Sequence, residues 1–300
     1  MKTKKITVIG NGQIGQAIVF LLNKNTEKNT IEIYDKDNLK NESKKTLKDC
    51  LVDTDFVFLC VPSWHLTETL MEIKNDIKPE TILISLSKGM DVSLIKSVDE
   101  LIEKNIKKAR YALLSGPMFA KEILADKMSF AVLASKDKQV FKKVSNLFGN
   151  TKLKLEYSKK VHSVAMSAVL KNIYTLAISI IDSSLDDNNI KGYLSVKALK
   201  EMEQIMIMLR LDKKILFGTS GLGDFVATVS SEHSQNRKVG TDISTKGNTS
   251  LKSEGLVSLP PLISKIGKKY KKLPMLCLLE KIISEKKAPK MEIENFIKNI

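Results

Sequence analysis

The sequence predicts an α/β fold in its first half and an all-helical region in its second. Three observations support this: a glycine-rich turn after a short apolar run, alternating strand-like and helix-like segments to about residue 158, and long helical periodicity beyond it. Strands that alternate with helices form parallel sheets covered on both faces. We therefore expect a doubly wound sheet over residues 1–158 and a helical domain over 159–300.

The first strand and turn have the pattern of a dinucleotide-binding unit. The apolar run Ile6–Ile9 leads into Gly10–Gly15, whose sequence is GNGQIG, and a helix-like stretch, Gln13–Asn23, follows. In this motif the first glycine makes a tight turn, the second admits a pyrophosphate and the third lets helix and strand pack closely. Free N–H groups at the helix N-terminus favour phosphate. The first domain is therefore expected to be Rossmann-type.

The second strand carries the signal for the cofactor. Ile31–Tyr34 ends at Asp35, twenty residues after Gly15. An acid at this place accepts hydrogen bonds from a ribose 2′-hydroxyl and repels a 2′-phosphate. The sequence therefore predicts a preference for NAD, with NADP as the open alternative because Lys36 partly offsets the repulsion.

Further elements follow from local composition. Strands rich in β-branched and aromatic residues are expected at Phe56–Val61, Thr81–Leu86, Tyr111–Ser115, Ser129–Ala134 and Lys152–Tyr157. Helices are expected between them at His65–Lys74, Val92–Lys104 and Gln139–Phe148. The polar segment 35–53 indicates a short helix or a loop.

After about Lys159 strand signals nearly vanish. Apolar residues at three- and four-residue intervals predict helices over Val161–Ile181 and Leu194–Leu211. The polar stretch Thr245–Glu254 is expected to be a loop, and Pro260-Pro261 a break before a further helix.

Composition restricts the class of partner. The chain is 43% hydrophobic and 28% charged, with a net charge of +15. Arginine occurs at only three positions, Arg110, Arg210 and Arg237, so the excess is lysine. Base recognition favours arginine, so we expect no nucleic-acid partner. The positive charge instead favours anionic ligands such as phosphates.

The sequence shows few features that indicate a cellular compartment or a metal site. We expect no apolar stretch near the ~18–20 residues of a membrane helix, no secretion signal, and a cytoplasmic protein with three reduced cysteines. The histidines are spaced unlike metal ligands, so no metal site is expected; they are His65, His162 and His233.

A polar pair interrupts the first long helix of the second half. Lys171-Asn172 follows Ala168-Val169-Leu170 and precedes Ile173. A lysine among such neighbours is costly unless it is satisfied, and desolvation lowers a lysine pKa toward neutrality. Lys171 is therefore a candidate to move a proton to or from an alcohol or carbonyl oxygen. The alternative is a helix that turns this spot to solvent.

A second polar group follows in the run Gly221–Asp224. Asp224 is a candidate to charge-pair with Lys171, and it could cap a helix beginning at Phe225; the two roles are compatible. Thr228 would share its helical face. With Ser234 and Asn236 it offers neutral hydrogen bonds for a phosphate or polyol, the alternative being polar side chains that only face solvent.

Two loops of the first domain are placed to meet ligands. Lys88-Gly89 follows the strand at Thr81–Leu86, and Gly116 follows the strand at Tyr111–Ser115. Ligands of open α/β sheets bind beyond the carboxyl ends of strands, so both loops are candidates.

The order of these motifs resembles the NAD(P)-dependent glycerol-3-phosphate dehydrogenases. GxGxxG, Lys-Gly, SGPxFAKE, Leu-Lys-Asn-Ile, GLGD and Asn-Arg-Lys follow one another between Ile6 and about Pro274. The resemblance implies an oxidoreductase that interconverts dihydroxyacetone phosphate and sn-glycerol 3-phosphate and supplies glycerophospholipid synthesis. For the oligomeric state we expect a homodimer, the commonest assembly among soluble oligomers.

The resemblance also completes the candidate site. Lys171 would be the general acid/base, supported by Asp224. The substrate-binding residues would be Lys88, Gly116, Asn172, Thr228, Ser234 and Asn236. The cofactor-binding residues would be Gly10, Asn11, Gly12, Gln13, Ile14, Gly15, Asp35, Lys88, Ala120 and Glu254.

Two positions depart from the family pattern at the substrate end. Gln235 stands where the family has an arginine, and Met118 where it has a threonine. Loss of a charge-assisted bidentate contact weakens phosphate binding. Two alternatives therefore stay open: a reductase of a related hydroxyacid or keto substrate, and a nucleotide-binding regulator without catalysis.

Overall fold

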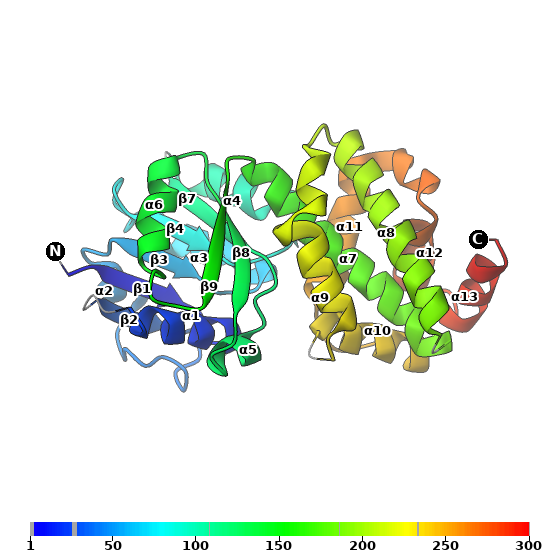
Figure 1. The fold of residues 1–300 in the computed structure, drawn as a ribbon, viewed down its shortest axis with the longest axis horizontal. Helices are drawn as coiled ribbons and strands as arrows, with labels where there is room; N and C mark the ends of the chain where they lie inside the picture. Colours follow the sequence, from blue (N-terminus) through cyan, green and yellow to red (C-terminus); the bar gives the residue numbers. More distant parts are fainter. Residues whose placement is uncertain (1–2, 26–28, 108, 186, 233, 300) are drawn as a thin grey trace. The chain divides into compact units, whose positions relative to one another are not determined.

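The computed structural model describes residues 3–25, 29–107, 109–185, 187–232 and 234–299, so His233 lies outside the described residues. The chain forms two compact units (Figure 1). The first comprises Met1–Lys88 and Val98–Ala165, and the second comprises Gly89–Ser97 and Met166–Ile300. Each unit has its own hydrophobic core.

The first unit is built on one sheet. In the described part of the chain it has seven strands in the order β2-β1-β3-β4-β7-β8-β9. The strands are β1 (Lys5–Ile9), β2 (Thr30–Tyr34), β3 (Phe56–Leu59), β4 (Ile82–Ser85), β7 (Arg110–Ser115), β8 (Ser129–Ala134) and β9 (Leu153–Ser158). Neighbours pair in parallel, but β7 and β8 are antiparallel. The expected doubly wound sheet is confirmed, and the reversal at β8 is an addition to it.

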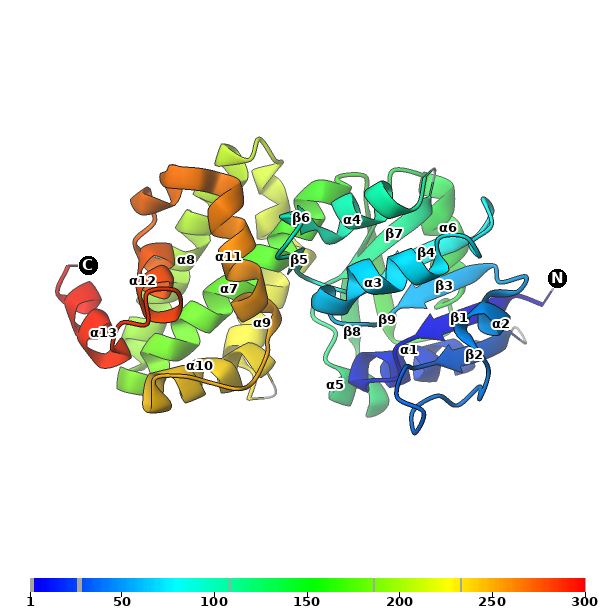
Figure 2. The same cartoon turned by 180° about the vertical axis from the view of Figure 1, so that it is seen from behind.

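Helices cover both faces of this sheet. They are α1 (Gln13–Asn23), α2 (Leu47–Leu51), α3 (Ser63–Ile73), α4 (Val98–Asn105), α5 (Ala120–Leu124) and α6 (Lys138–Asn146). Because β2 and β4 lie on opposite sides of the β1–β3 pair, right-handed crossovers place α1 and α3 on opposite faces. Figure 2 shows α3 and α4 in front of the sheet, and Figure 1 shows α6 on the other side. Apolar residues of α1 and α6 share one core cluster.

The second unit is almost wholly helical. Its helices are most of α7 (Val161–Leu185), α8 (Asn188–Met208), α9 (Asp224–Ser230), α10 (Gln235–Lys246), α11 (Glu254–Ile266), α12 (Pro274–Ile283) and α13 (Pro289–Lys298). The core of the unit is built around α7, where Tyr174 and Ile173 are fully buried. The expected helical C-terminal domain is confirmed.

The long helix α7 corrects one expectation. Among the described residues it is the one helix long and apolar enough to cross a membrane by length and composition, although no such stretch was expected. Its most apolar window is entirely buried in the structure. A helix that is apolar on all sides is the normal centre of a large helical core.

Two expected elements are wrong in detail. The helix predicted over Val92–Lys104 begins only at Val98, because β5 (Met90–Asp91) and β6 (Lys96–Ser97) form an antiparallel hairpin before it. Pro260 and Pro261 lie inside α11 rather than before a helix. Packing of the fully buried Leu259 and Leu262 outweighs the backbone bonds lost at the prolines.

The hairpin belongs to the second unit, and Met90 of β5 enters the core of that unit. Met90 is fully buried within the core cluster of that unit. Its backbone N–H donates to Ser258 Oγ on α11 at 3.1 Å. The nine residues 89–97 therefore belong to the second unit although they are flanked in sequence by the first unit.

Candidate active site

The glycine turn after β1 has the geometry that the motif requires. Gly10 has φ +97°, and a Cβ there would lie 2.9 Å from the carbonyl oxygen of Cys60. A Cβ on Gly15 would lie 1.9 Å from the carbonyl oxygen of Gly10. A side chain at either position would therefore break the contact between turn, helix and sheet.

Gly12 differs from the other two because its side faces open space. A Cβ there would have no described atom within 4 Å. Gly12 is also the N-cap of α1, and within the described chain no side chain caps that helix. The amides that begin α1, at Gln13 and Ile14, are thus available to an anion that approaches over Gly12.

A cavity of about 350 Å³ adjoins this turn. Its lining includes Gly10, Gly12, Asp35, Lys36, His65 and Glu72. Asp35 accepts hydrogen bonds from the backbone N–H of Asn11 at 2.7 Å and of Asp37 at 2.9 Å. The buried Asn11 Oδ1 has no hydrogen-bond partner among the described residues. An open glycine, uncapped helix amides and a fixed acid in one cavity fit a dinucleotide.

We expect Gly12→Ala to separate binding from folding. The methyl group meets no protein atom, so the free energy of unfolding should change by no more than about 1 kcal/mol, the cost of alanine at an N-cap. It would occupy the approach to the α1 amides and weaken NADH binding at least about tenfold. Fluorescence titration with NADH and denaturant unfolding measure the two effects.

Gly149→Ala is the matched control, because a Cβ there makes only an ordinary contact, 3.7 Å from the carbonyl oxygen of Asn146. It should change neither quantity. Unaltered NADH binding in Gly12→Ala would contradict the placement of the phosphates over this turn.

Two predicted ligand loops of the first unit meet each other. Lys88 follows β4, and its Nζ donates to the carbonyl oxygen of Gly116, after β7, at 3.0 Å. A Cβ on Gly116 would lie 2.5 Å from the carbonyl oxygen of Phe130, so this turn also requires glycine. Ala120 begins α5, which packs against α1.

The second unit brings Lys171 and Asp224 together. Lys171 Nζ lies 3.3 Å from Asp224 Oδ1 and donates to Thr228 Oγ1 at 3.0 Å. The three residues are only 5%, 3% and 4% exposed. A charge this well buried is tolerated because it is paired and hydrogen-bonded. The solvent-facing alternative for Lys171 is therefore wrong.

Asp224 is placed by an irregular turn. Thr219–Gly223 forms a π-helical turn that leads directly into α9, and Asp224 is the first residue of that helix. A Cβ on Gly221 would lie 2.3 Å from the carbonyl oxygen of Leu216. Because Asp224 lies inside the helix with Gly223 as its N-cap, the expected capping role is wrong.

A chain of amides continues from Asn172. Asn236 Nδ2 donates to Asn172 Oδ1 at 2.9 Å, and the backbone N–H of Gly255 donates to Asn236 Oδ1 at 3.0 Å. A Cβ on Gly255 would lie 2.4 Å from the carbonyl oxygen of Asn172, so glycine permits this approach of α11 to α7. Buried amides fixed in this way are rigid hydrogen-bonding groups.

The other predicted residues of the second unit lie at helix starts. Ser234 caps α10, and its Oγ accepts the backbone N–H of Arg237 at 3.3 Å. Glu254 is the first residue of α11, which Ser253 caps. Glu254 thus belongs to the second unit, whereas the other predicted cofactor residues belong to the first.

Comparison with known proteins adds to this geometry. Residues 36–141 match the model of the N-terminal part of NAD-dependent glycerol-3-phosphate dehydrogenase, and residues 160–294 match that of its C-terminal part. A glycerol-3-phosphate dehydrogenase [NAD(P)+] of Fusobacterium nucleatum is 30% identical over 79% of this chain and 77% of its own. The chain belongs to the NAD-dependent glycerol-3-phosphate dehydrogenase family. The Clostridium botulinum (strain Eklund 17B / Type B) relative is 28% identical over 98% of this chain and 97% of its own.

Solved structures agree on the dehydrogenase fold. The glycerol-3-phosphate dehydrogenase of Coxiella burnetii superposes with a TM-score of 0.88 over 99% of each chain at 20% identity. That of Plasmodium falciparum gives 0.84 over 99% of this chain and 96% of its own at 22% identity.

The two departures from the dehydrogenase pattern have different surroundings. Met118 is 9% exposed and belongs to the core cluster of the first unit, so its thioether has a packing role. Gln235 is exposed at the first turn of α10, where its Nε2 donates to the carbonyl oxygen of Lys252 at 3.4 Å. Gln235 is therefore free of packing constraints on a larger side chain.

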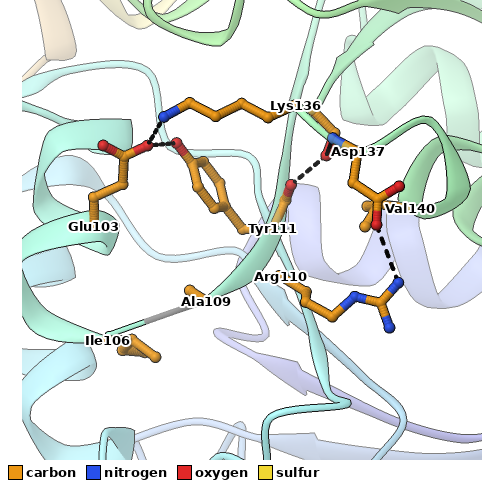
Figure 3. Close-up of a pocket in the computed structure, with 9 residues that line it drawn as sticks. Glu103, Ile106, Ala109, Arg110, Tyr111, Lys136, Asp137 and Val140 are labelled. Atoms are coloured by element: carbon orange, nitrogen blue, oxygen red, sulfur yellow. Dashed lines mark hydrogen bonds and ion pairs between the residues drawn. The ribbon is translucent and has the colours of Figure 1, made fainter.

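A second cavity, of about 280 Å³, lies near the amino end of β7, away from the glycine turn (Figure 3). Its charges are satisfied internally: Tyr111 Oη and Lys136 Nζ both contact Glu103 Oε1 at 2.6 Å, and Arg110 pairs with Asp137 at 3.2 Å. Burial opposes ionisation of Glu103, but these two hydrogen bonds outweigh it and lower its pKa. These contacts join α4, through Glu103, to β7, through Tyr111.

Sequence reasoning missed two charged groups. One is Lys36, which is bound by Glu68 and Glu72, and the other is Glu201, which lies buried against Tyr174. The partners are far apart in sequence, so no local pattern signals either group.

In the described residues no cluster of three or more His, Cys, Asp or Glu side chains is placed to hold a metal ion.

Proposed function

We propose that the chain interconverts dihydroxyacetone phosphate and sn-glycerol 3-phosphate with NAD(P)H in the cytoplasm and so supplies glycerophospholipid synthesis. Residues 1–158 would bind the dinucleotide and residues 159–300 would carry the catalytic group, in a homodimer. The observation that carries the proposal is the buried Lys171–Asp224–Thr228 cluster in a chain that also has an intact dinucleotide turn. A regulator without catalysis has no use for that costly cluster.

Three side chains are proposed to act in the reduction: Lys171, Asp224 and Thr228. The bound nicotinamide supplies the hydride. Lys171 delivers the proton to the carbonyl oxygen of the substrate and, in the reverse direction, removes it from the alcohol. Asp224 and Thr228 hold the ammonium in position, and burial keeps water from it.

The phosphate end is proposed at the start of α10. Asn236 is fixed there by Asn172 and Gly255, and the second N–H of its Nδ2 is proposed to donate to the phosphate, beside Ser234, whose Oγ caps the helix. Lys88 and Gly116 are proposed to contact the substrate from the first unit.

The test is NADH oxidation with dihydroxyacetone phosphate beside a Gln235→Arg variant. The exposed position accepts arginine, and a charge-assisted hydrogen bond exceeds a neutral one by about 1–1.5 kcal/mol, so KM should fall roughly tenfold. Gln139→Arg, an equally exposed change on α6, controls for added net charge and should leave KM unchanged.

Absence of turnover with either cofactor at millimolar substrate would refute the proposal. A panel of carboxylated ketones run in parallel tests the related keto-acid reductase, which the neutral Gln235 keeps open. If a carboxylated ketone is turned over faster than dihydroxyacetone phosphate, the enzyme is a keto-acid reductase instead.

A further inference from the structure

We propose that Glu68 and Glu72 make the enzyme select NADH over NADPH, because they hold the Lys36 ammonium that would otherwise bind a 2′-phosphate. The inference deepens the proposed function and rests on its cofactor. It concerns two carboxylates of α3 that no motif marks.

Lys36 lies at the place where the two cofactors differ. It directly follows Asp35, the acid expected at the ribose 2′-hydroxyl, and both line the cavity beside the glycine turn. Asp35 is fixed by the amides of Asn11 and Asp37. A 2′-phosphate in this cavity would need a cation from the segment that follows β2.

The side chain of Lys36 is already committed to α3. Its Nζ lies 2.8 Å from Glu68 Oε1 and 2.8 Å from Glu72 Oε1. The two glutamates are one turn apart on the same helix face, so a single ammonium meets both. The hydrogen bonds that Lys36 donates to Glu68 and then to Glu72 raise the pKa of Lys36, and Lys36 in turn lowers the pKa of Glu68.

The second lysine of the cavity is committed as well. Lys40 Nζ lies 3.1 Å from Asp37 Oδ2. With Asp35 and Glu72 the lining therefore carries three carboxylates against two ammonium groups, each ammonium with a carboxylate partner. A 2′-phosphate entering here meets net negative charge, whereas a 2′-hydroxyl donates to Asp35 without displacing any pair.

The pairs are exposed, so the effect is graded. Exposed ion pairs are individually weak, and each glutamate removed should shift the ratio of NADPH to NADH affinity by a few-fold. Glu68→Gln/Glu72→Gln should therefore raise that ratio about tenfold. The gain depends on Lys36, so Lys36→Gln added to the double variant should remove it.

The sequence provides its own probe. Its single tryptophan, Trp64, lies on α3 beside His65, which lines the cavity. Quenching of Trp64 by NADH and by NADPH gives both dissociation constants without substrate. The series is wild type, each single glutamine variant, the double variant, the triple variant with Lys36→Gln, and Glu80→Gln as an exposed control outside the cavity.

Support requires tighter wild-type binding of NADH, a raised NADPH ratio in the double variant and its loss in the triple variant. An unchanged ratio in the double variant, persistence of the gain in the triple variant, or an equal gain in Glu80→Gln would overturn the inference. Failure to bind either nucleotide contradicts both this inference and the proposed function. A ratio shift without turnover of dihydroxyacetone phosphate overturns only the proposed function.

Discussion

Lys171→Met is expected to abolish turnover and to destabilise the protein at the same time. Loss of the proton-transferring group should lower kcat by about 10²–10⁴-fold. The same change takes the Lys171 ammonium away from Asp224, which is only 3% exposed. Breaking a buried ion pair from one side costs about 3–5 kcal/mol. Steady-state kinetics and denaturant unfolding measure the two losses.

A second substitution separates the two losses. Asp224→Asn in the Lys171→Met background removes the buried carboxylate charge that had paired with Lys171, so most of the unfolding free energy should return. Activity should not return, because the proton donor is still missing. Thr228→Val provides a matched control: it removes the hydroxyl that accepts from Lys171 Nζ and donates to the backbone carbonyl of Asp224, but it keeps the ion pair, and it should cost only about 1–3 kcal/mol.

Activity in the double variant would show that Lys171 serves the ion pair rather than the reaction. Equal stability of Lys171→Met and wild type would show that the buried pair carries no energetic weight. Either result would separate the geometry of the cluster from the role assigned to it.

Glu201→Ala is expected to destabilise the helical unit by about 3–5 kcal/mol. Glu201 Oε2 accepts the Tyr174 hydroxyl at 2.9 Å and the backbone N–H of Leu276 at 3.3 Å, and Oε1 accepts the N–H of Met275 at 2.8 Å. Alanine leaves all three donors buried and unsatisfied beside a cavity. Chemical unfolding measures the loss.

Glu203→Ala, two residues along the same helix, is the control for this prediction. Its carboxylate makes a more exposed ion pair with Lys213 at 2.8 Å. It should cost no more than about 1 kcal/mol. Similar losses at positions 201 and 203 would refute the role of Glu201 as the acceptor for these three donors.

Glu201 also gives the protein a pH dependence with a fixed sign. Burial raises the pKa of this carboxyl above its ordinary 4.5, and the three hydrogen bonds only partly offset that effect. The folded state thus holds the proton more tightly than the unfolded state. Its contribution to stability is greatest below pH 4.5 and declines as the pH rises through the raised pKa. Glu201→Gln should therefore cost more in acid than at neutral pH, and a cost that grows with pH would contradict this.

Local patterns in the sequence were enough to predict the parts of the site that local chemistry determines. The turn at Gly10 and Gly15 follows from steric limits that act within a few residues. Lys171 was recognisable because one ammonium stands in an otherwise apolar helix, and such a group demands a partner. Asp224 was the nearest acid with a glycine-rich approach, and it is that partner.

Features that depend on distant segments could not be predicted in this way. Lys36 and Glu72 are 36 residues apart and meet only after β2 and α3 are placed on the sheet. Pro260 and Pro261 oppose a helix locally, yet core packing holds α11 together through them. The hairpin at Met90 has strands of two residues each, too short for any periodicity.

The burial of Met90 has a consequence for how the two halves can be inherited or exchanged. A chimaera that joins the first half of one relative to the second half of another at a single point near residue 160 would supply the helical core with a foreign Met90 segment. The backbone N–H that meets Ser258 Oγ would remain, but the buried side chain at position 90 would come from the other parent. A workable exchange must carry residues 89–97 with the helices, which needs three junctions instead of one. The two units are separate in space, but neither is a single continuous stretch of sequence, and this restricts recombination between diverged copies.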